Sequence, residues 1–178
     1  CPNPLTLPLP VSIDRATSVL YPGQTRGGDY KPHGGFRFDG AGQTNSVTVT
    51  APMAATVLRG SRYLEGGEIQ YLFDFVNACG ILYRFDHLRD LSARFQAMAD
   101  AFPAATEGAS ATTTISGQTV SSGETIATAV GHRTPSSISF LMRLKIATNP
   151  SSGAMMKSTT HFPLVEMSLR PCAVTFTW

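Results

Sequence analysis

Hydrophobic and polar residues alternate with a period of two along much of the chain. Successive side chains of a strand point to opposite faces of a sheet, so this alternation predicts strands. Short turns separate the segments, and neighbouring segments are therefore expected to pair as hairpins of an antiparallel sheet. The expected strands lie within residues 14–21, 46–50, 51–58, 68–76, 80–85, 112–120, 124–130, 138–146, 162–169 and 172–178.

One segment has the periodicity of a helix instead. Leu91, Phe95, Met98 and Phe102 recur at positions i, i+4, i+7 and i+11, which places them on one stripe of a helix over residues 90–102. The proline that follows ends this helix. We interpret the stripe as packing against the sheet rather than as a functional surface.

The pattern as a whole predicts a mainly β fold, an antiparallel β-sheet sandwich or open barrel with one α-helix. Residues 1–29 are expected to form an extended, proline-rich lead-in and an edge strand. Residues 30–150 form the main β domain, in which 60–67 is a hairpin connection, and 151–178 form a C-terminal β-hairpin packed on the same domain.

Composition narrows the class of protein. The chain has 178 residues, of which 42% are hydrophobic and only 15% charged, with 16 Gly and 12 Pro. Such a turn-rich, sparsely charged chain is typical of β architecture. The net charge of +2 gives no reason to expect a nucleic-acid partner, and no apolar run approaches the roughly 20 residues of a transmembrane helix.

The three cysteines, Cys1, Cys79 and Cys172, cannot all pair within one chain. The chain opens at Cys1 without an initiator Met, so it is expected to begin after a processing site or at an artificial boundary. One hypothesis is a lipid anchor on Cys1, as in bacterial envelope lipoproteins, and its competitor is a disulfide between Cys1 and Cys172 or between Cys79 and Cys172. A secreted, periplasmic or cell-envelope protein is expected.

The candidate chemistry centres on residues 31–39. From Gly35 onward this stretch is expected to be a strand, with Phe36 and Phe38 on one face and Arg37 and Asp39 on the other. The histidine at position 33 precedes a Gly-Gly pair, which would allow the backbone to bend and turn the imidazole toward the charged face.

Taken in order, short motifs of this chain resemble the catalytic domain of the lysostaphin and LytM family, zinc endopeptidases that cut peptide cross-links of bacterial peptidoglycan. The resemblance spans about residues 30–150 and implies the duplicated hybrid motif fold. Family members carry His-x-Gly-x-Asp, Ala-Pro, His-Leu and Gly-(Glu/Gln)-x-Ile segments, followed by a His-x-His-Phe strand that ends near Asn-Pro. The matching segments here are His33-Gly34-Gly35-Phe36, Ala51-Pro52, Phe85-Asp86-His87-Leu88, Gly123-Glu124-Thr125-Ile126 and Asn149-Pro150.

The resemblance implies a zinc site that this chain does not complete. The family's metal ligands are the first His, the Asp four residues later and the second His of His-x-His. His33 matches the first, but Arg37 and Ser139 stand at the other two positions, and a guanidinium has no lone pair for a metal. Ser137 replaces one of the two histidines that would stabilise the attacked carbonyl, and His87 remains as the other.

We therefore expect a degenerate LytM-like domain that is non-catalytic and needs no cofactor. It would bind a peptide, a peptidoglycan fragment or an envelope protein in the former active-site groove, where Arg37 would hold a carboxylate. The expected groove residues are His33, Arg37, Asp39, His87, Ser137 and Ser139.

Two other interpretations stay open. An active zinc endopeptidase of cell-wall peptides would need His33, Asp39 and His161 as ligands, with His87 as a catalytic residue. Alternatively, Arg37 forms an ion pair with Asp39 or Asp86 that closes the groove, and His87 is a hydrogen-bonded histidine at a strand end. Neither serine has a recognisable base and orienting partner that would make it a nucleophile.

Overall fold

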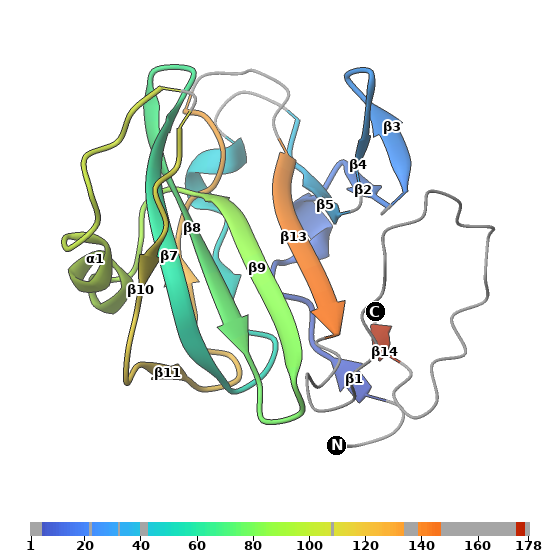
Figure 1. Ribbon diagram of the computed structural model, residues 1–178. Helices are drawn as coiled ribbons and strands as arrows, with labels where there is room; N and C mark the ends of the chain where they lie inside the picture. Colours follow the sequence, from blue (N-terminus) through green and yellow to red (C-terminus); the bar gives the residue numbers. More distant parts are fainter. Residues whose placement is uncertain are drawn as a thin grey trace, which may run out of the picture.

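The computed structural model describes residues 5–21, 23–31, 33–39, 43–107, 109–133, 139–146 and 174–176. Strands dominate this part of the chain and it holds one α-helix, which confirms the mainly β fold with antiparallel sheets (Figure 1). The elements in chain order are β1 (Leu5–Leu7), the 3-10 helix Ile13–Arg15, β2 (Ser18–Leu20), β3 (Gln24–Arg26), β4 (Asp29–Lys31), β5 (Gly34–Arg37), the 3-10 helix Gln43–Ser46, β6 (Val49–Thr50), β7 (Ala55–Glu65), β8 (Glu68–Val76), β9 (Ile81–Leu88), α1 (Ala93–Ala99), β10 (Thr113–Thr114), β11 (Thr119–Val120), β12 (Thr125–Ala127), β13 (Ser139–Ile146) and β14 (Val174–Phe176).

The main sheet has eight strands within the described residues. Its order is β10-β7-β8-β9-β13-β5-β2, and β11 also pairs with β7. Strands β7, β8 and β9 follow one another as hairpins, whereas β13 inserts between β9 and β5 (Figure 1). This insertion brings β5 and β9, which are distant in sequence, to the two sides of one strand.

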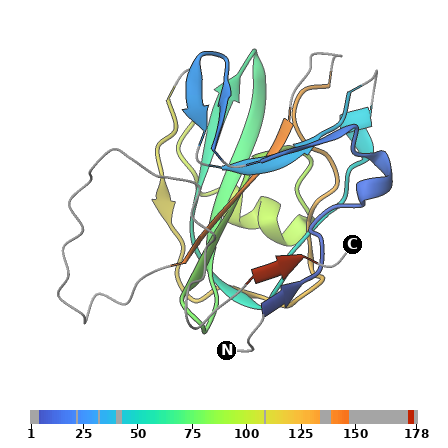
Figure 2. The same cartoon turned by 90° about the vertical axis from the view of Figure 1, so that its right-hand side faces the viewer.

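Three two-stranded sheets complete the described fold. The pairs β12–β6 and β3–β4 are antiparallel, and β1 pairs with β14 in parallel. The β1–β14 pair joins segments from near the two ends of the chain, and both views show these strands side by side (Figures 1 and 2). The expected edge strand within 14–21 is confirmed as β2, which pairs with β5.

The core lies on one face of β7, β8 and β9, where α1 also packs. Phe73, Phe75 and Phe85 of the sheet and Phe95 of the helix are fully buried. The Phe73 and Phe95 rings meet edge to face, with centroids 5.0 Å apart. Figure 2 shows the helix on one side of the long strands. Because side chains alternate along a strand, the opposite face of the same strands carries the polar residues.

The helix is shorter than the periodicity predicts. The expected helix over 90–102 is reduced to Ala93–Ala99, because Leu91 forms a β-bridge with Ala127 and Phe102 belongs to a tighter turn in which its N–H donates to the carbonyl of Ala99. The stripe is still a packing surface, since Phe95 and Phe102 are buried and Leu91 packs against the core.

The hairpin connection expected over 60–67 is present but much shorter than expected. Strand β7 continues to Glu65, and the turn consists of Gly66 and Gly67, both with positive φ. Gly60 lies inside the strand. A glycine is required there because a Cβ would come within 2.4 Å of the Phe102 ring. A glycine that makes room for packing was therefore mistaken for a turn residue.

Other expected strands are confirmed with changed boundaries. Expected strand 46–50 is reduced to β6 because residues 43–46 form a 3-10 helix, and 112–120 is split into β10 and β11. The domain boundary at 150 and the C-terminal hairpin with its strand at 162–169 fall on residues 147–173, outside the described residues. Across the described ranges, every helix is too short or too polar to cross a membrane.

Candidate functional site

The end of β9 carries the site, and an irregular sheet register creates it. Tyr71 pairs with Leu88 and Phe73 pairs with Phe85, so the single residue Leu72 lies opposite both Asp86 and His87. This is a β-bulge, which bends the strand and redirects side chains. His87 has a φ of 59°, the one positive φ among described non-glycine residues. Such a backbone is costly for a residue with a Cβ and must be held by its surroundings.

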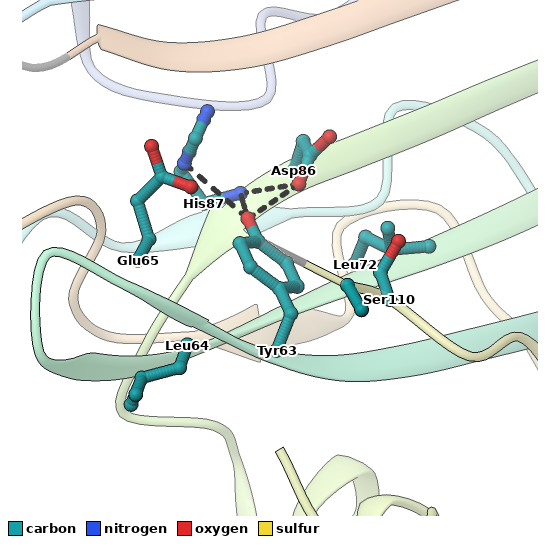
Figure 3. A pocket seen from close by; sticks show the side chains of 8 residues that line it. Tyr63, Leu64, Glu65, Leu72, Asp86, His87 and Ser110 are labelled. Carbon is teal, nitrogen blue, oxygen red and sulfur yellow. Dashed lines mark hydrogen bonds between the residues drawn. The ribbon is translucent and has the colours of Figure 1, made fainter. Parts of the chain in front are cut away.

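Hydrogen bonds hold the bulge from three strands. The Tyr63 hydroxyl of β7 donates to Asp86 Oδ1 at 2.6 Å and accepts from the His87 N–H at 3.1 Å. Asp86 Oδ1 also accepts from the His87 N–H at 3.0 Å (Figure 3). Burial, together with the charge and hydrogen bond of Asp86, raises the pKa of Tyr63 above its ordinary value. The phenol therefore stays protonated and a donor.

The imidazole of His87 is oriented by Gln70 of β8. The distance from His87 Nδ1 to Gln70 Oε1 is 2.7 Å, and Gln70 is fully buried. With the amide in this orientation, Nδ1 carries the proton because an amide oxygen only accepts. Nε2 of a neutral ring is then left with a lone pair and can accept a hydrogen bond from a ligand.

A cavity of about 250 Å³ lies beside this network. Its polar lining comes from Tyr63, Asp86, His87 and the exposed Glu65, all near the same end of the sheet (Figure 3). The rest of the lining is Leu64, Leu72, Ala109 and Ser110. The cavity thus joins two carboxylates and an imidazole to an apolar wall.

A row of charged side chains crosses the same face of the sheet next to the cavity. Asp74 lies two residues after Leu72 on β8, and Arg84 lies two residues before Asp86 on β9. Asp74 Oδ2 accepts from Arg59 Nε at 2.6 Å, and Arg84 donates to both oxygens of Asp74 at 2.5 and 2.8 Å. Burial by itself would raise the pKa of Asp74, but the hydrogen bonds from Arg84 and Arg59 outweigh it and hold this pKa below its usual value. Two guanidinium groups share one carboxylate, so the row has a net positive charge.

A second charged cluster fixes the chain after the bulge. The Arg89 side chain is 3% exposed, and its Nη1 lies 3.6 Å from Glu68 Oε2. The Arg133 N–H donates to both Glu68 oxygens, and the Arg133 guanidinium pairs with Asp90 at 3.0 Å. Burial lowers the pKa of Arg89. The cluster ties β8, the end of β9 and residues 131–133 together, and thereby supports the backbone of His87.

The structure places the other predicted residues on neighbouring strands. Arg37 ends β5 and pairs with Asp39, with 3.0 Å between Nη2 and Oδ1. Asp39 also accepts from the Thr17 hydroxyl at 2.9 Å. Arg37 lies directly opposite Ser139 of β13 in the sheet register. Among the described residues, the hydrogen-bond partners of His87 include neither Arg37 nor Asp39.

For the remaining predicted site residues, only their positions in the chain can be compared with the site. His33 is half-buried immediately before β5. Ser137 and His161 lie outside the described residues, as do Cys1 and Cys172. Cys79, in the turn between β8 and β9, is disulfide-bonded, and its partner is not one of the described residues. Within the described ranges, no three His, Cys, Asp or Glu side chains gather as a metal site.

Sequence reasoning missed Tyr63, Glu65 and Gln70. The signal was the alternation of Arg59, Ser61, Tyr63 and Glu65 along one face of β7. Assigning 60–67 to a connection concealed that alternation.

Comparisons of the chain with protein-family models, with curated proteins and with solved structures give no match.

Proposed function

We propose that this protein is a non-catalytic binding module related to the LytM-type peptidases, and that it holds a short peptide of the bacterial cell wall on the polar face of β7–β9. The observation that supports the relation to these peptidases is the pairing of Arg37 with Ser139 across β5 and β13, and the observation that supports the binding face is the cavity beside His87. Arg37 and Ser139 stand at two positions at which the resemblance expects metal ligands, and they lie opposite each other, as two ligands of one ion would.

The chemistry at that point favours binding over metal-assisted hydrolysis. A permanent cation occupies one position, and it is already neutralised by Asp39. Asp39, a ligand of the alternative zinc site, is likewise engaged by Arg37 and Thr17. His87, which the resemblance retains from the second pair of histidines, has its Nδ1 bound to Gln70, and its Nε2 is left for a hydrogen bond with a ligand.

The cavity supplies a place for the ligand. Its mixture of carboxylates, imidazole and leucine side chains suits a peptide, which offers N–H groups and aliphatic side chains together. The disulfide of Cys79 supports an oxidising compartment outside the cytoplasm, such as the periplasm or cell envelope.

The test begins with untagged full-length protein, zinc analysis and incubation with purified peptidoglycan. We expect less than stoichiometric zinc, no released peptides, and sedimentation of the protein with the peptidoglycan. Stoichiometric zinc that is lost on His33→Ala, together with cleavage of cross-links, would overturn the proposal in favour of a peptidase.

A matched pair of variants locates the binding. Ala109 lines the cavity and is exposed, so Ala109→Trp fills the cavity without removing a hydrogen bond of the bulge. Ala111, also exposed, does not line it, and Ala111→Trp is the control. Binding should be lost in the first variant and kept in the second. Equal binding by both would place the ligand elsewhere.

A further inference from the structure

The polar face of β7–β9 has opposite charges at its two ends. At one end Glu65, Asp86 and His87 surround the cavity, and at the other Arg59 and Arg84 share Asp74. We infer that this face is a dipolar groove that selects an extended peptide carrying a cationic side chain at one end and a free carboxylate at the other. The inference rests on the proposed function and adds the chemistry of the ligand.

The acidic end has acceptor capacity to spare. Asp86 uses Oδ1 for Tyr63 and His87, and no contact of its Oδ2 is found among the described residues. Glu65 is exposed and forms no ion pair with any residue of the described ranges. Leu64 and Leu72 line the same cavity and offer contact to an aliphatic stem. An ammonium group on a methylene chain satisfies both features.

The basic end has donor capacity to spare. Arg59 spends only Nε on Asp74, and its side chain is 53% exposed. Its two terminal nitrogens have no hydrogen-bond partner among the described residues and are available to bind a carboxylate in a bidentate manner. Asp74 accepts hydrogen bonds from both arginines, but its single negative charge neutralises only one of the two positive charges. A ligand carboxylate would restore the balance.

The spacing of the two ends sets the length of the ligand. Arg59 and Glu65 are six positions apart on the same face of β7, which corresponds to roughly 20 Å along the strand. Arg84 and Asp86 are two positions apart on β9, or roughly 7 Å. A peptide of about three to six extended residues, at roughly 3.3 Å each, spans these limits.

The probe is the synthetic pentapeptide acetyl-Lys-Ala-Ala-Ala-Ala with a free carboxyl terminus. Two matched peptides each remove one charge: norleucine in place of lysine, and a C-terminal amide in place of the carboxylate. Calorimetric titration of the full chain should show about tenfold weaker binding for each matched peptide.

Protein variants assign each charge to its end. Glu65→Gln should weaken binding of the lysine peptide about tenfold and leave the norleucine peptide unaffected, and Arg59→Gln should do the same for the free acid against the amide. Asp29→Asn on the β3–β4 hairpin controls for lost negative charge. Arg94→Gln controls for a lost arginine–carboxylate pair, since Arg94 pairs with Glu124 at 2.6 Å.

Each outcome decides the inference separately from the proposed function. If both matched peptides, each lacking one charge, bind as tightly as acetyl-Lys-Ala-Ala-Ala-Ala, or if peptidoglycan binds while none of the pentapeptides does, the dipolar groove is wrong and the binding module stands. If neither peptidoglycan nor any peptide binds, both fail.

Discussion

The two faces of β7, β8 and β9 come from the same three strands but are stabilised in different ways. On the core face, Phe73, Phe75 and Phe85 are fully buried and contact one another and α1 through their rings. On the polar face, the side chains are held by hydrogen bonds and ion pairs, such as the hydrogen bond from the Tyr63 hydroxyl to Asp86. Apolar packing is non-directional, whereas hydrogen bonds require geometry. The core face therefore fixes the sheet, and the polar face is free to hold a strained bulge.

The largest effect is expected on the core face. Phe73→Ala removes a fully buried ring that contacts Phe75, Phe95 and Phe102, so it should lower the free energy of unfolding by about 3–5 kcal/mol. Urea denaturation measures the loss. A loss under 1 kcal/mol would mean that this face is loosely packed and that the contrast between the faces is mistaken.

The next largest effect concerns Asp74 on the polar face. Asp74→Asn weakens the hydrogen bonds to Arg59 and Arg84 and should cost about 2–3 kcal/mol at pH 7. The pKa of Asp74 is lower in the folded protein than the unfolded value of about 3.9, so its stabilisation is complete above that pH and lost as acid protonates the folded state.

The difference in unfolding free energy between wild type and Asp74→Asn should consequently shrink below about pH 4. Denaturation at a series of pH values checks this. A difference that stays constant down to pH 2 would show that the carboxylate charge contributes nothing.

Tyr63 and Tyr83 allow one tyrosine of each face to be compared. Tyr63→Phe removes the donor to Asp86 and should cost about 1.5 kcal/mol. Burial raises the pKa of both phenols in the folded protein, so their stabilisation is complete below about pH 10 and declines as the pH rises further.

Alkaline denaturation of Tyr63→Phe and Tyr83→Phe should therefore be less steep than that of wild type. Tyr21 is 61% exposed, and Tyr21→Phe should follow the wild-type curve. Identical curves for all three variants would count against a buried hydroxyl network at the bulge.

The smallest effect isolates backbone strain at the bulge. His87→Gly and His87→Ala both remove the imidazole, but glycine adopts a positive φ without a Cβ clash, so the glycine variant should be about 1 kcal/mol more stable. Thr56, exposed in β7, is the control position. The Thr56→Gly variant should be less stable than the Thr56→Ala variant, because glycine weakens an ordinary strand. Equal stability of the two His87 variants would show that the bulge relaxes once the side chain is gone.

The sequence by itself determined the elements whose side-chain period is visible locally. The alternation in 68–76 and 138–146 gave β8 and β13 nearly to the residue, and the period of Leu91, Phe95 and Phe102 gave the packing stripe around α1. Both patterns arise from burial of every second residue, or of every third to fourth, and need no information about distant parts of the chain.

Only the tertiary structure decided which chemical groups meet. Gly60 reads as a turn residue until Phe102, distant in sequence, is seen to occupy the space of its Cβ. His87 was singled out, but its partners Tyr63 and Gln70 come from two other strands, and the bulge that joins them depends on a register shift between β8 and β9. Register and cross-strand contacts are set by non-local packing, so a local pattern cannot specify them.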